Sequence, residues 1–205
     1  MILKKAQSFE LSSQRTLGIL DTEFNHSNGY IARTATRNSI LLGTMAAEQF
    51  ARPDRSALEE IIAKRCLIDH QHYKRQAFSI TSCDLAGCYD RIVHTAAALA
   101  LLRIGLPHSR IKSMFFSIQK MIHRIRTVYG DSDITYGGDD IGDWKNWPQG
   151  VLQGNSAGPA IWCTLSSVIF DILHSRGFSP DTMSSISKQL FTLVSFAYVD
   201  DCDLF

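Results

Sequence analysis

The sequence predicts an α+β fold in which helices back an antiparallel sheet, and three stretches of the chain indicate it. The run 190–199 is apolar except for one threonine and one serine, and it ends in the carboxylate pair Asp200 and Asp201. A second short strand-like run ends in Asp84. Between these runs, the glycine-rich turn 149–159 leads into an apolar helix. Short runs rich in β-branched and aromatic residues are typical of strands buried on at least one face.

The adjacent carboxylates of Asp200 and Asp201 need a physical explanation. Two half-buried carboxylates repel one another unless a cation lies between them. Tight hairpins favour Asn-Gly and other glycine-containing turns, so turn chemistry does not account for the pair. Taken alone, the pair is better explained as a solvated turn at a strand end. With Asp84 ending another strand-like run, a divalent cation becomes the better explanation.

The composition is that of an ordinary globular protein. The chain has 205 residues, of which 45% are hydrophobic and 20% charged, with a formal net charge of +1. We expect a core in one or two lobes, no membrane span and no signal peptide. Residues 1–78 carry 11 Lys and Arg against 8 Asp and Glu, whereas residues 79–205 carry 10 against 12. This indicates either a phosphate-gripping lobe beside a metal-binding lobe or random unevenness.

The cysteines show no pattern of a structural metal site or a disulfide framework. They are odd in number and form no Cys-x-x-Cys motif, so we expect free thiols in a reducing compartment. No His and Cys cluster accompanies the aspartates, which argues against zinc. The five cysteines are Cys66, Cys83, Cys88, Cys163 and Cys202.

The N-terminal part of the chain is predicted to be irregular before its first helix. Residues 25–29 contain two asparagines, a serine and a glycine, which mark a turn, and 13–20 suit a strand. Arg33 and Arg37 lie four residues apart and would share a face of a helix. A solvated helix face is the preferred interpretation of these arginines.

The next helix has a clear start signal. Ser56 and Glu59 form the capping box Ser-x-x-Glu, so the helix is predicted to begin at Ser56 and to run to about residue 70. Arg52 and Arg55 are therefore expected in a loop just before a helix. One interpretation of this loop is an exposed surface turn with an Arg-Asp pair.

The remaining elements follow from hydrophobic spacing and from glycine and proline breakers. A basic strand is expected after the second of two helices, and a loop containing the acidic pair Asp139 and Asp140 is expected to have no role in the site. The predicted elements are a helix over 95–103, a helix over 110–120 capped by Ser109, a strand over 122–128, a hairpin and loop over 130–147, and a helix over 157–174 beneath the sheet.

Three blocks of the sequence, in this order, resemble the palm motifs of reverse transcriptases. Residues 84–89 resemble motif A, residues 149–159 resemble motif B, and residues 197–201, an aromatic-x-Asp-Asp box, resemble motif C. The similarity is greatest to the reverse transcriptases of non-LTR retrotransposons. It covers about residues 15–205 and implies RNA-directed DNA synthesis.

The resemblance also implies an architecture, that of a right-hand polymerase. Fingers are expected over residues 1–78, with a helix over 30–42, and a palm over residues 79–205, with the thumb absent. We therefore expect a fragment that does not support DNA synthesis alone, because alignment of the reacting groups can be worth ~7–11 kcal/mol. The implied partners are an RNA template, a DNA primer, a dNTP and the missing domains of a parent polyprotein.

The implied chemistry is transfer of a dNTP to a primer 3′-hydroxyl with two Mg²⁺ ions, Mn²⁺ being an alternative. Magnesium prefers hard oxygen ligands. By the resemblance, Asp84 and Asp200 bridge the ions, Asp201 lies nearby, and the backbone carbonyl of Leu85 is a further ligand. These three aspartates are the predicted catalytic residues.

The resemblance further implies residues that contact the nucleotide. Tyr89 would stack under the sugar and select deoxynucleotides, although on its own a core position is the better interpretation of this side chain. Gly87 and Cys88 are small enough for backbone N–H groups to approach the triphosphate. Gln153 and Gly154, in the turn before a helix, would position the nucleotide and template.

Arg52 and Arg55 correspond to a fingers loop whose basic residues meet the incoming triphosphate. The loop departs from the commoner pattern because it lacks glycine and is one residue shorter. The nucleotide-binding role and the surface-loop interpretation are equally supported. A different class of function also stays open, namely a reverse-transcriptase-like RNA-binding module without catalysis. Survival of all three aspartates favours the enzyme.

Overall fold

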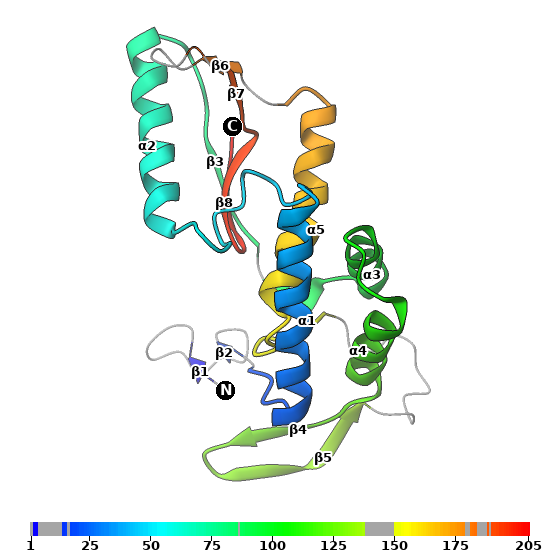
Figure 1. The fold of residues 1–205 in the computed structure, drawn as a ribbon. Helices are drawn as coiled ribbons and strands as arrows, with labels where there is room; N and C mark the ends of the chain where they lie inside the picture. The colour runs from blue at the N-terminus through cyan, green and yellow to red at the C-terminus, as the bar shows by residue number, and fades with distance from the viewer. Residues whose placement is uncertain are drawn as a thin grey trace.

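In the computed structural model, the described residues are 2–3, 14–15, 17–85, 87–137, 150–178, 181–183, 188 and 190–205. They form helices interleaved with short antiparallel sheets (Figure 1). The helices are α1 (Thr22–Leu41), α2 (Ala57–Lys74), the 3-10 helix η2 (Tyr89–Arg91), α3 (His94–Arg103), α4 (His108–Lys120) and α5 (Gly158–Ser175). The strands are β1 (Ile2–Leu3), β2 (Gln14–Arg15), β3 (Thr81–Asp84), β4 (Ile122–Thr127), β5 (Gly130–Gly137), β6 (Asp181–Met183), β7 (Leu190–Thr192), β8 (Ser195–Tyr198) and β9 (Asp201–Leu204).

Helices α1 and α5 pack against each other through the middle of the molecule, and α3 packs on α5 (Figure 1). Helix α4 lies beside α3, and the β4–β5 hairpin projects from the same end of the molecule. At the opposite end, α2 lies beside the strands β3 and β8. The larger hydrophobic core is shared by the central helices; it includes Ile31, Leu101, Met114, Ile118 and Ile161.

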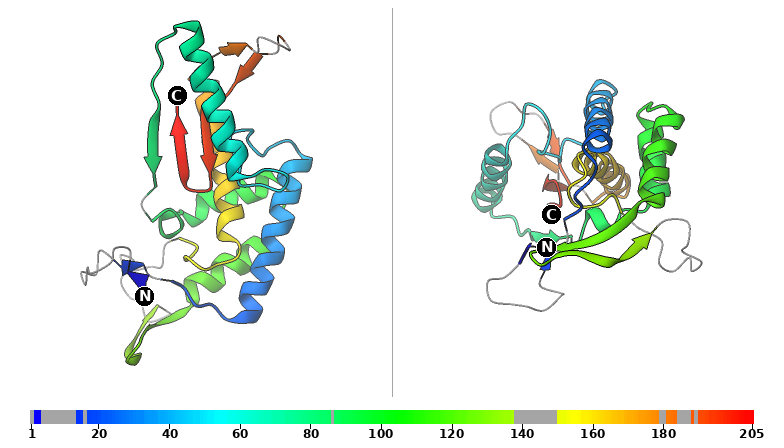
Figure 2. Two further views of the ribbon diagram at one scale, coloured as in Figure 1. Left: turned by 90° about the vertical axis from the view of Figure 1, so that its left-hand side faces the viewer. Right: turned by 90° about the horizontal axis from the view of Figure 1, so that it is seen from below.

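The sheet that carries the predicted site has the order β3-β9-β8, with both pairings antiparallel (Figure 2). One face packs toward α5, where Phe170, Val194 and Ala197 form a second small core. The other face meets α2, because Lys64 reaches across to Asp203 on β9. The predicted helix beneath the sheet is thus confirmed as α5, one residue later at each end than expected.

Helix α1 begins eight residues earlier than the sequence indicated. Its N-cap is Asp21, whose carboxylate accepts hydrogen bonds from the backbone N–H groups of Glu23 and Phe24. The expected turn at 25–29 is wrong, since these residues lie inside the helix. Gly29 packs close to Ser156 of the motif B turn. Tertiary contact there outweighs the turn preference of the individual residues.

Helix α2 begins as predicted. Ser56 is its N-cap and accepts a hydrogen bond from the backbone N–H of Glu59, at 3.3 Å. The expected cap of α4 is wrong: Pro107 occupies the cap position without a side-chain hydrogen bond, and the helix already includes Ser109. The fixed backbone of proline suits the start of a helix and replaces the side-chain cap.

Two strand predictions were too long. In the described part of the run 13–20, Gln14–Arg15 forms a strand and 17–20 is irregular. The run 190–199 is divided into β7 and β8 around Val194, which is buried. The hairpin expected after residue 130 is confirmed through Gly137, but the acidic pair Asp139 and Asp140 lies outside the described residues.

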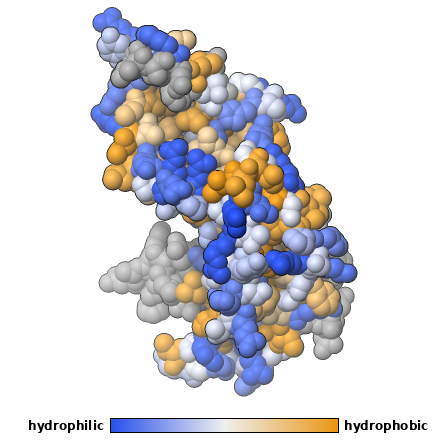
Figure 3. Space-filling model, in the orientation of Figure 1, coloured by the Kyte–Doolittle hydropathy of each residue, from blue (hydrophilic) through white to orange (hydrophobic). Residues whose placement is uncertain are grey.

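Several large apolar side chains stay exposed. A patch at the C-terminal end of α1, orange near the centre of Figure 3, consists of Ile40, Leu41 and Leu42. Leu58 and Ile61 of α2 are likewise more than half exposed, at 65% and 55%. In the part of the chain that the structure describes, no helix combines the length and hydropathy that crossing a membrane requires.

Candidate active site

The predicted catalytic aspartates lie at one end of the β3-β9-β8 sheet. Asp84, the last residue of β3, is the cross-strand partner of Asp201, the first residue of β9. Tyr198 on β8 is paired with the same Asp201, so Val199 and Asp200 form the turn between β8 and β9. Cross-strand partners share a face of the sheet. The strands therefore bring Asp84 and Asp201 to neighbouring positions with Asp200 beside them.

No described cation forms an ion pair with Asp84, Asp200 or Asp201. Two of them lie directly opposite one another, an arrangement that is unfavourable for like charges. Their oxygens are of the kind that Mg²⁺ and Mn²⁺ prefer. Within the described residues, no three His, Cys, Asp or Glu side chains are gathered closely enough to form a metal site by themselves. The three aspartates thus offer the type of oxygen that a hard cation prefers, but the described side chains are not gathered into a metal-binding group.

The Val199–Asp200 turn is held by residues that the sequence reasoning missed. Val199 has a φ of 58°, and its carbonyl accepts hydrogen bonds from Trp162 Nε1 at 2.5 Å and Gln49 Nε2 at 3.4 Å. Gln49 is fully buried and also donates to Ser166 Oγ at 2.9 Å. An amide buried between apolar segments signals such a role, but the sequence does not show its partner.

The turn after β3 lies close to Asp200. Burial, and secondarily the negative charge of Asp200, raises the pKa of the Cys88 thiol to about 12. The same two causes, in the same order, raise the pKa of Tyr89. The carbonyl of Leu85, an expected metal ligand, accepts a hydrogen bond from the Cys88 N–H at 3.1 Å. Gly87 is exposed and has a φ of 63°. The structure thus brings this predicted nucleotide-binding turn together with the Asp200 carboxylate.

The motif B turn is locked onto the same segment. The N–H of Val151 donates to the carbonyl of Tyr89 at 2.8 Å. Gly150 has a φ of 79°, and a Cβ at this position would lie 2.3 Å from the Tyr89 carbonyl oxygen. Only glycine fits this approach. The Tyr89 ring lies against Gly158 at the start of α5, so a core contact and proximity to Asp200 are both realised.

The other predicted motif B residues are bound to the N-terminal segment. The N–H of Gly18 donates to the carbonyl of Gln153 at 2.6 Å. Gly154 has a φ of 114°, and a Cβ there would meet the Gly18 carbonyl oxygen at 2.4 Å. Asn25 accepts a hydrogen bond from the Ser156 N–H at 2.8 Å. These contacts give the glycine a structural reason to be present, beside any role toward a nucleotide.

Arg52 and Arg55 line a cavity of about 630 Å³, together with Arg33 and Arg37 of α1. None of the described lining residues is acidic, and Tyr198 lies at the cavity wall. Burial, and then the charge of Arg55, lowers the pKa of Arg52. Arg55 also contacts the Phe50 ring at 5.5 Å and pairs with Glu59 at 3.7 Å. Arg33 and Arg37 are exposed, as the predicted solvated helix face requires, and they also line this basic cavity.

The chain resembles solved structures of telomerase, a reverse-transcriptase-related enzyme. Telomerase from Candida albicans, in a complex with the TWJ fragment of telomeric RNA, matches with a TM-score of 0.52 and 11% identity. Apo telomerase from Candida tropicalis, truncated from its C-terminal domain, matches with a TM-score of 0.51 and 15% identity. These alignments cover 88% and 87% of this chain, and 30% and 33% of the telomerase chains.

At these identities the likeness shows the fold alone. The fold is reverse-transcriptase-like, and its α+β class with antiparallel sheets is as predicted from the sequence. This chain spans about a third of the length of those telomerases. No protein-family model and no curated protein sequence matches it.

Proposed function

We propose that this chain carries the fingers and palm of an RNA-directed DNA polymerase of the non-LTR retrotransposon type. The observation that carries the proposal is the pairing of Asp84 with Asp201, beside Asp200, at one end of the sheet. A second line of support is the likeness of the fold to telomerase structures, which is separate from the three sequence blocks that resemble reverse transcriptases.

In this proposal Asp84, Asp200, Asp201 and the carbonyl of Leu85 hold two Mg²⁺ or Mn²⁺ ions. When bound, the ions would neutralise charge on the phosphates and favour loss of the primer hydroxyl proton. The chain itself directs the carboxylates. Strand register sets Asp84 against Asp201, while the donors on the Val199 carbonyl fix the turn that carries Asp200.

The residues around the carboxylates would bind the nucleotide. Tyr89, packed against the start of α5, would block a 2′-hydroxyl, and the backbone of Gly87 and Cys88 would approach the triphosphate. Gln153 and Gly154 would position the nucleotide and template from the motif B turn. The four arginines around the basic cavity offer charge for phosphates of a nucleotide or of template RNA.

The alternative is an RNA-binding module that lacks catalysis. The basic cavity favours it, because arginines and phosphate suffice for RNA binding without a metal. The two functions differ in what they require. A polymerase site binds a dNTP only with a divalent cation, whereas an RNA-gripping module binds RNA regardless of that cation.

Calorimetric titration of dGTP into the chain, with and without Mg²⁺, tests the proposal. We expect binding that depends on Mg²⁺ and that is lost in Asp84→Asn. In Tyr89→Ala, the preference for dGTP over GTP should shrink, because the sugar loses its 2′ block. Asp171→Asn on α5, whose carboxylate pairs with Arg103, is the matched control and should bind as the unaltered chain does. Tight RNA binding with no Mg²⁺-dependent dGTP binding would favour the alternative.

A further inference from the structure

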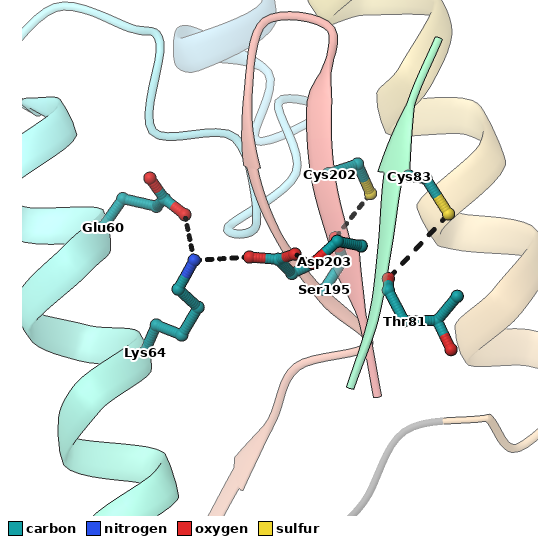
Figure 4. A network of polar contacts seen from close by, with 8 residues as sticks. Glu60, Lys64, Thr81, Cys83, Ser195, Cys202 and Asp203 are labelled. Carbon is teal, nitrogen blue, oxygen red and sulfur yellow. Dashed lines mark hydrogen bonds and ion pairs between the residues drawn. The ribbon is translucent and has the colours of Figure 1, made fainter. Parts of the chain in front are cut away.

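Two cysteines lie directly opposite one another on the sheet, and the proposed function gives neither of them a role. Cys83 on β3 is the cross-strand partner of Cys202 on β9. Both are free and partly exposed. Because cross-strand partners share a face, the two sulfur atoms lie on the same side of the sheet (Figure 4).

The spacing of such a pair suits a covalent bond. Direct partners in an antiparallel pair have Cα atoms about 4.5 or about 5.5 Å apart, and disulfides span Cα separations of about 4.4–6.8 Å. Their Cβ atoms are about 4.5–5.5 Å apart, whereas a disulfide needs about 3.5–4.5 Å. The strands must therefore draw together slightly. A bond closed under such tension is readily reduced again.

The present contacts of the two thiols leave them able to meet. The Cys202 sulfur lies 2.9 Å from Ser195 Oγ on β8, and the Cys83 sulfur lies 3.8 Å from the Thr81 carbonyl on its own strand (Figure 4). Neither contact is a strong hydrogen bond, because thiols are weak donors and acceptors. Rotation of each side chain about its Cα–Cβ bond directs the sulfur toward the neighbouring strand.

Their position in the sheet also distinguishes these thiols from the other cysteines. Among the described strands β3 is an edge strand, so a small reagent reaches Cys83 from the side. Cys88 and Cys163 are buried, whereas Cys66 is exposed on α2 and lies outside the sheet.

We propose that Cys83 and Cys202 form a neighbouring-thiol site, whose ligands are small-molecule disulfides and trivalent arsenicals. With glutathione disulfide, the Cys83 sulfur bonds to one glutathione sulfur and releases the other as a thiol. The Cys202 sulfur then bonds to the Cys83 sulfur and releases the second glutathione thiol. The glutathione disulfide is reduced, the protein dithiol is oxidised, and the two thiol protons leave with the two glutathiones.

The bond would tie together the two strands that carry the paired aspartates. Cys83 immediately precedes Asp84, and Cys202 immediately follows Asp201. Closing the disulfide fixes the separation of β3 and β9 at that end of the sheet. This inference needs no catalysis by the aspartates, so it stands or falls independently of the proposed polymerase function.

The experiment uses the Cys66→Ser chain, so that the exposed thiol on α2 cannot cross-link two molecules. After incubation with glutathione disulfide and alkylation of the remaining thiols, intact mass and peptide mapping are measured. We expect loss of two free thiols without bound glutathione, and a dithiothreitol-sensitive link between the peptides of Cys83 and Cys202. Adding Cys202→Ser should convert this product into a stable glutathione adduct on Cys83.

A second probe does not depend on oxidation. Phenylarsine oxide, which needs two neighbouring thiols, should bind the Cys66→Ser chain and should lose that binding when Cys83→Ser is added. Cys163→Ser is the control for loss of any thiol, and it should leave both results unchanged. A stable glutathione adduct in the chain that retains both cysteines, or arsenical binding that survives Cys83→Ser, would overturn the proposal.

Discussion

The two ends of the β3-β9-β8 sheet differ in whether their carboxylates have a cationic partner among the described residues. At the turn end, Asp84 and Asp201 are paired in register without a described ion pair. Two residues further along the same strand, Asp203 pairs with Lys64 of α2 (Figure 4). Asp203 also accepts a hydrogen bond from Ser82 on β3. Within the described residues, a cation therefore pairs with Asp203 of β9 and none pairs with Asp201 of the same strand.

The partners of Asp203 show what this cation does. Burial alone would raise the pKa of Asp203, but hydrogen bonds from Lys64 and Ser82, with the charge of Lys64, lower it overall. The hydrogen bond to Asp203 raises the pKa of Lys64 in return. The carboxylate at this end is thus stabilised within the protein. At the turn end, Asp84 and Asp201 are exposed to solvent, and the described residues provide neither of them with a comparable ion pair.

The largest expected effect is on cation binding at the turn end. Asp84→Asn should weaken Mn²⁺ binding by about 100-fold, because one of the paired carboxylates is lost. Titration followed by electron paramagnetic resonance of free Mn²⁺ measures this. Asp203→Asn removes a carboxylate from the same face but from the paired end, so its Mn²⁺ affinity should match that of the unaltered chain. Equal losses of Mn²⁺ affinity in the two variants would show that the two ends of the sheet do not differ in cation binding.

The next effect concerns stability at the paired end. Lys64→Met should lower the free energy of unfolding by about 1–2 kcal/mol, because Asp203 loses its cationic partner. Urea denaturation measures it. Arg65→Met is a matched control on the same helix, since its pair with Asp69 is 73% and 57% exposed and should contribute well under about 1 kcal/mol. Similar losses of unfolding free energy in the two variants would show that the Lys64–Asp203 pair contributes no more than an exposed ion pair on α2.

A smaller effect is expected at the turn itself. Trp162→Phe removes the Nε1–H that donates to the Val199 carbonyl and should cost about 1 kcal/mol of unfolding free energy. It should also weaken Mn²⁺ binding, because the turn that carries Asp200 is less well held. Phe196, buried in the sheet, offers a control: Phe196→Leu should cost stability without changing the affinity for Mn²⁺. An unchanged Mn²⁺ affinity in Trp162→Phe would show that the indole does not help to hold the turn that carries Asp200.

The smallest effect is a pH dependence at the paired end. The pKa of Asp203 is lowered on folding from its ordinary value of 3.8, so its contribution to stability is complete above that value. The contribution is lost as the pH falls through the lowered pKa. Urea midpoints measured between neutral pH and pH values below 3.8 should therefore fall less steeply in Lys64→Met than in the unaltered chain. Parallel curves would contradict the assigned cause.

The features predicted correctly from the sequence are those that depend on local chemistry. The capping box at Ser56 located a helix start, and short apolar runs indicated the strand that ends at Asp84 and the strand that precedes Asp200 and Asp201. Asn25 was misassigned to a turn, because its hydrogen bonds with Gly154 and Ser156 join α1 to a segment far along the chain. Gln49 and Trp162 were missed for the same reason: their common acceptor, the Val199 carbonyl, is a backbone atom that no motif records.

The left-handed backbone conformation of Val199 affects both the stability and the conformational freedom of the turn between β8 and β9. Side chains branched at Cβ are unfavourable in this region, at a cost of about 1–2 kcal/mol, whereas glycine occupies it freely. A glycine here would relax the turn and would also let it sample many conformations. The valine leaves the turn few alternatives, so the molecule gives up folding stability at this position and gains a fixed direction for the residue that follows.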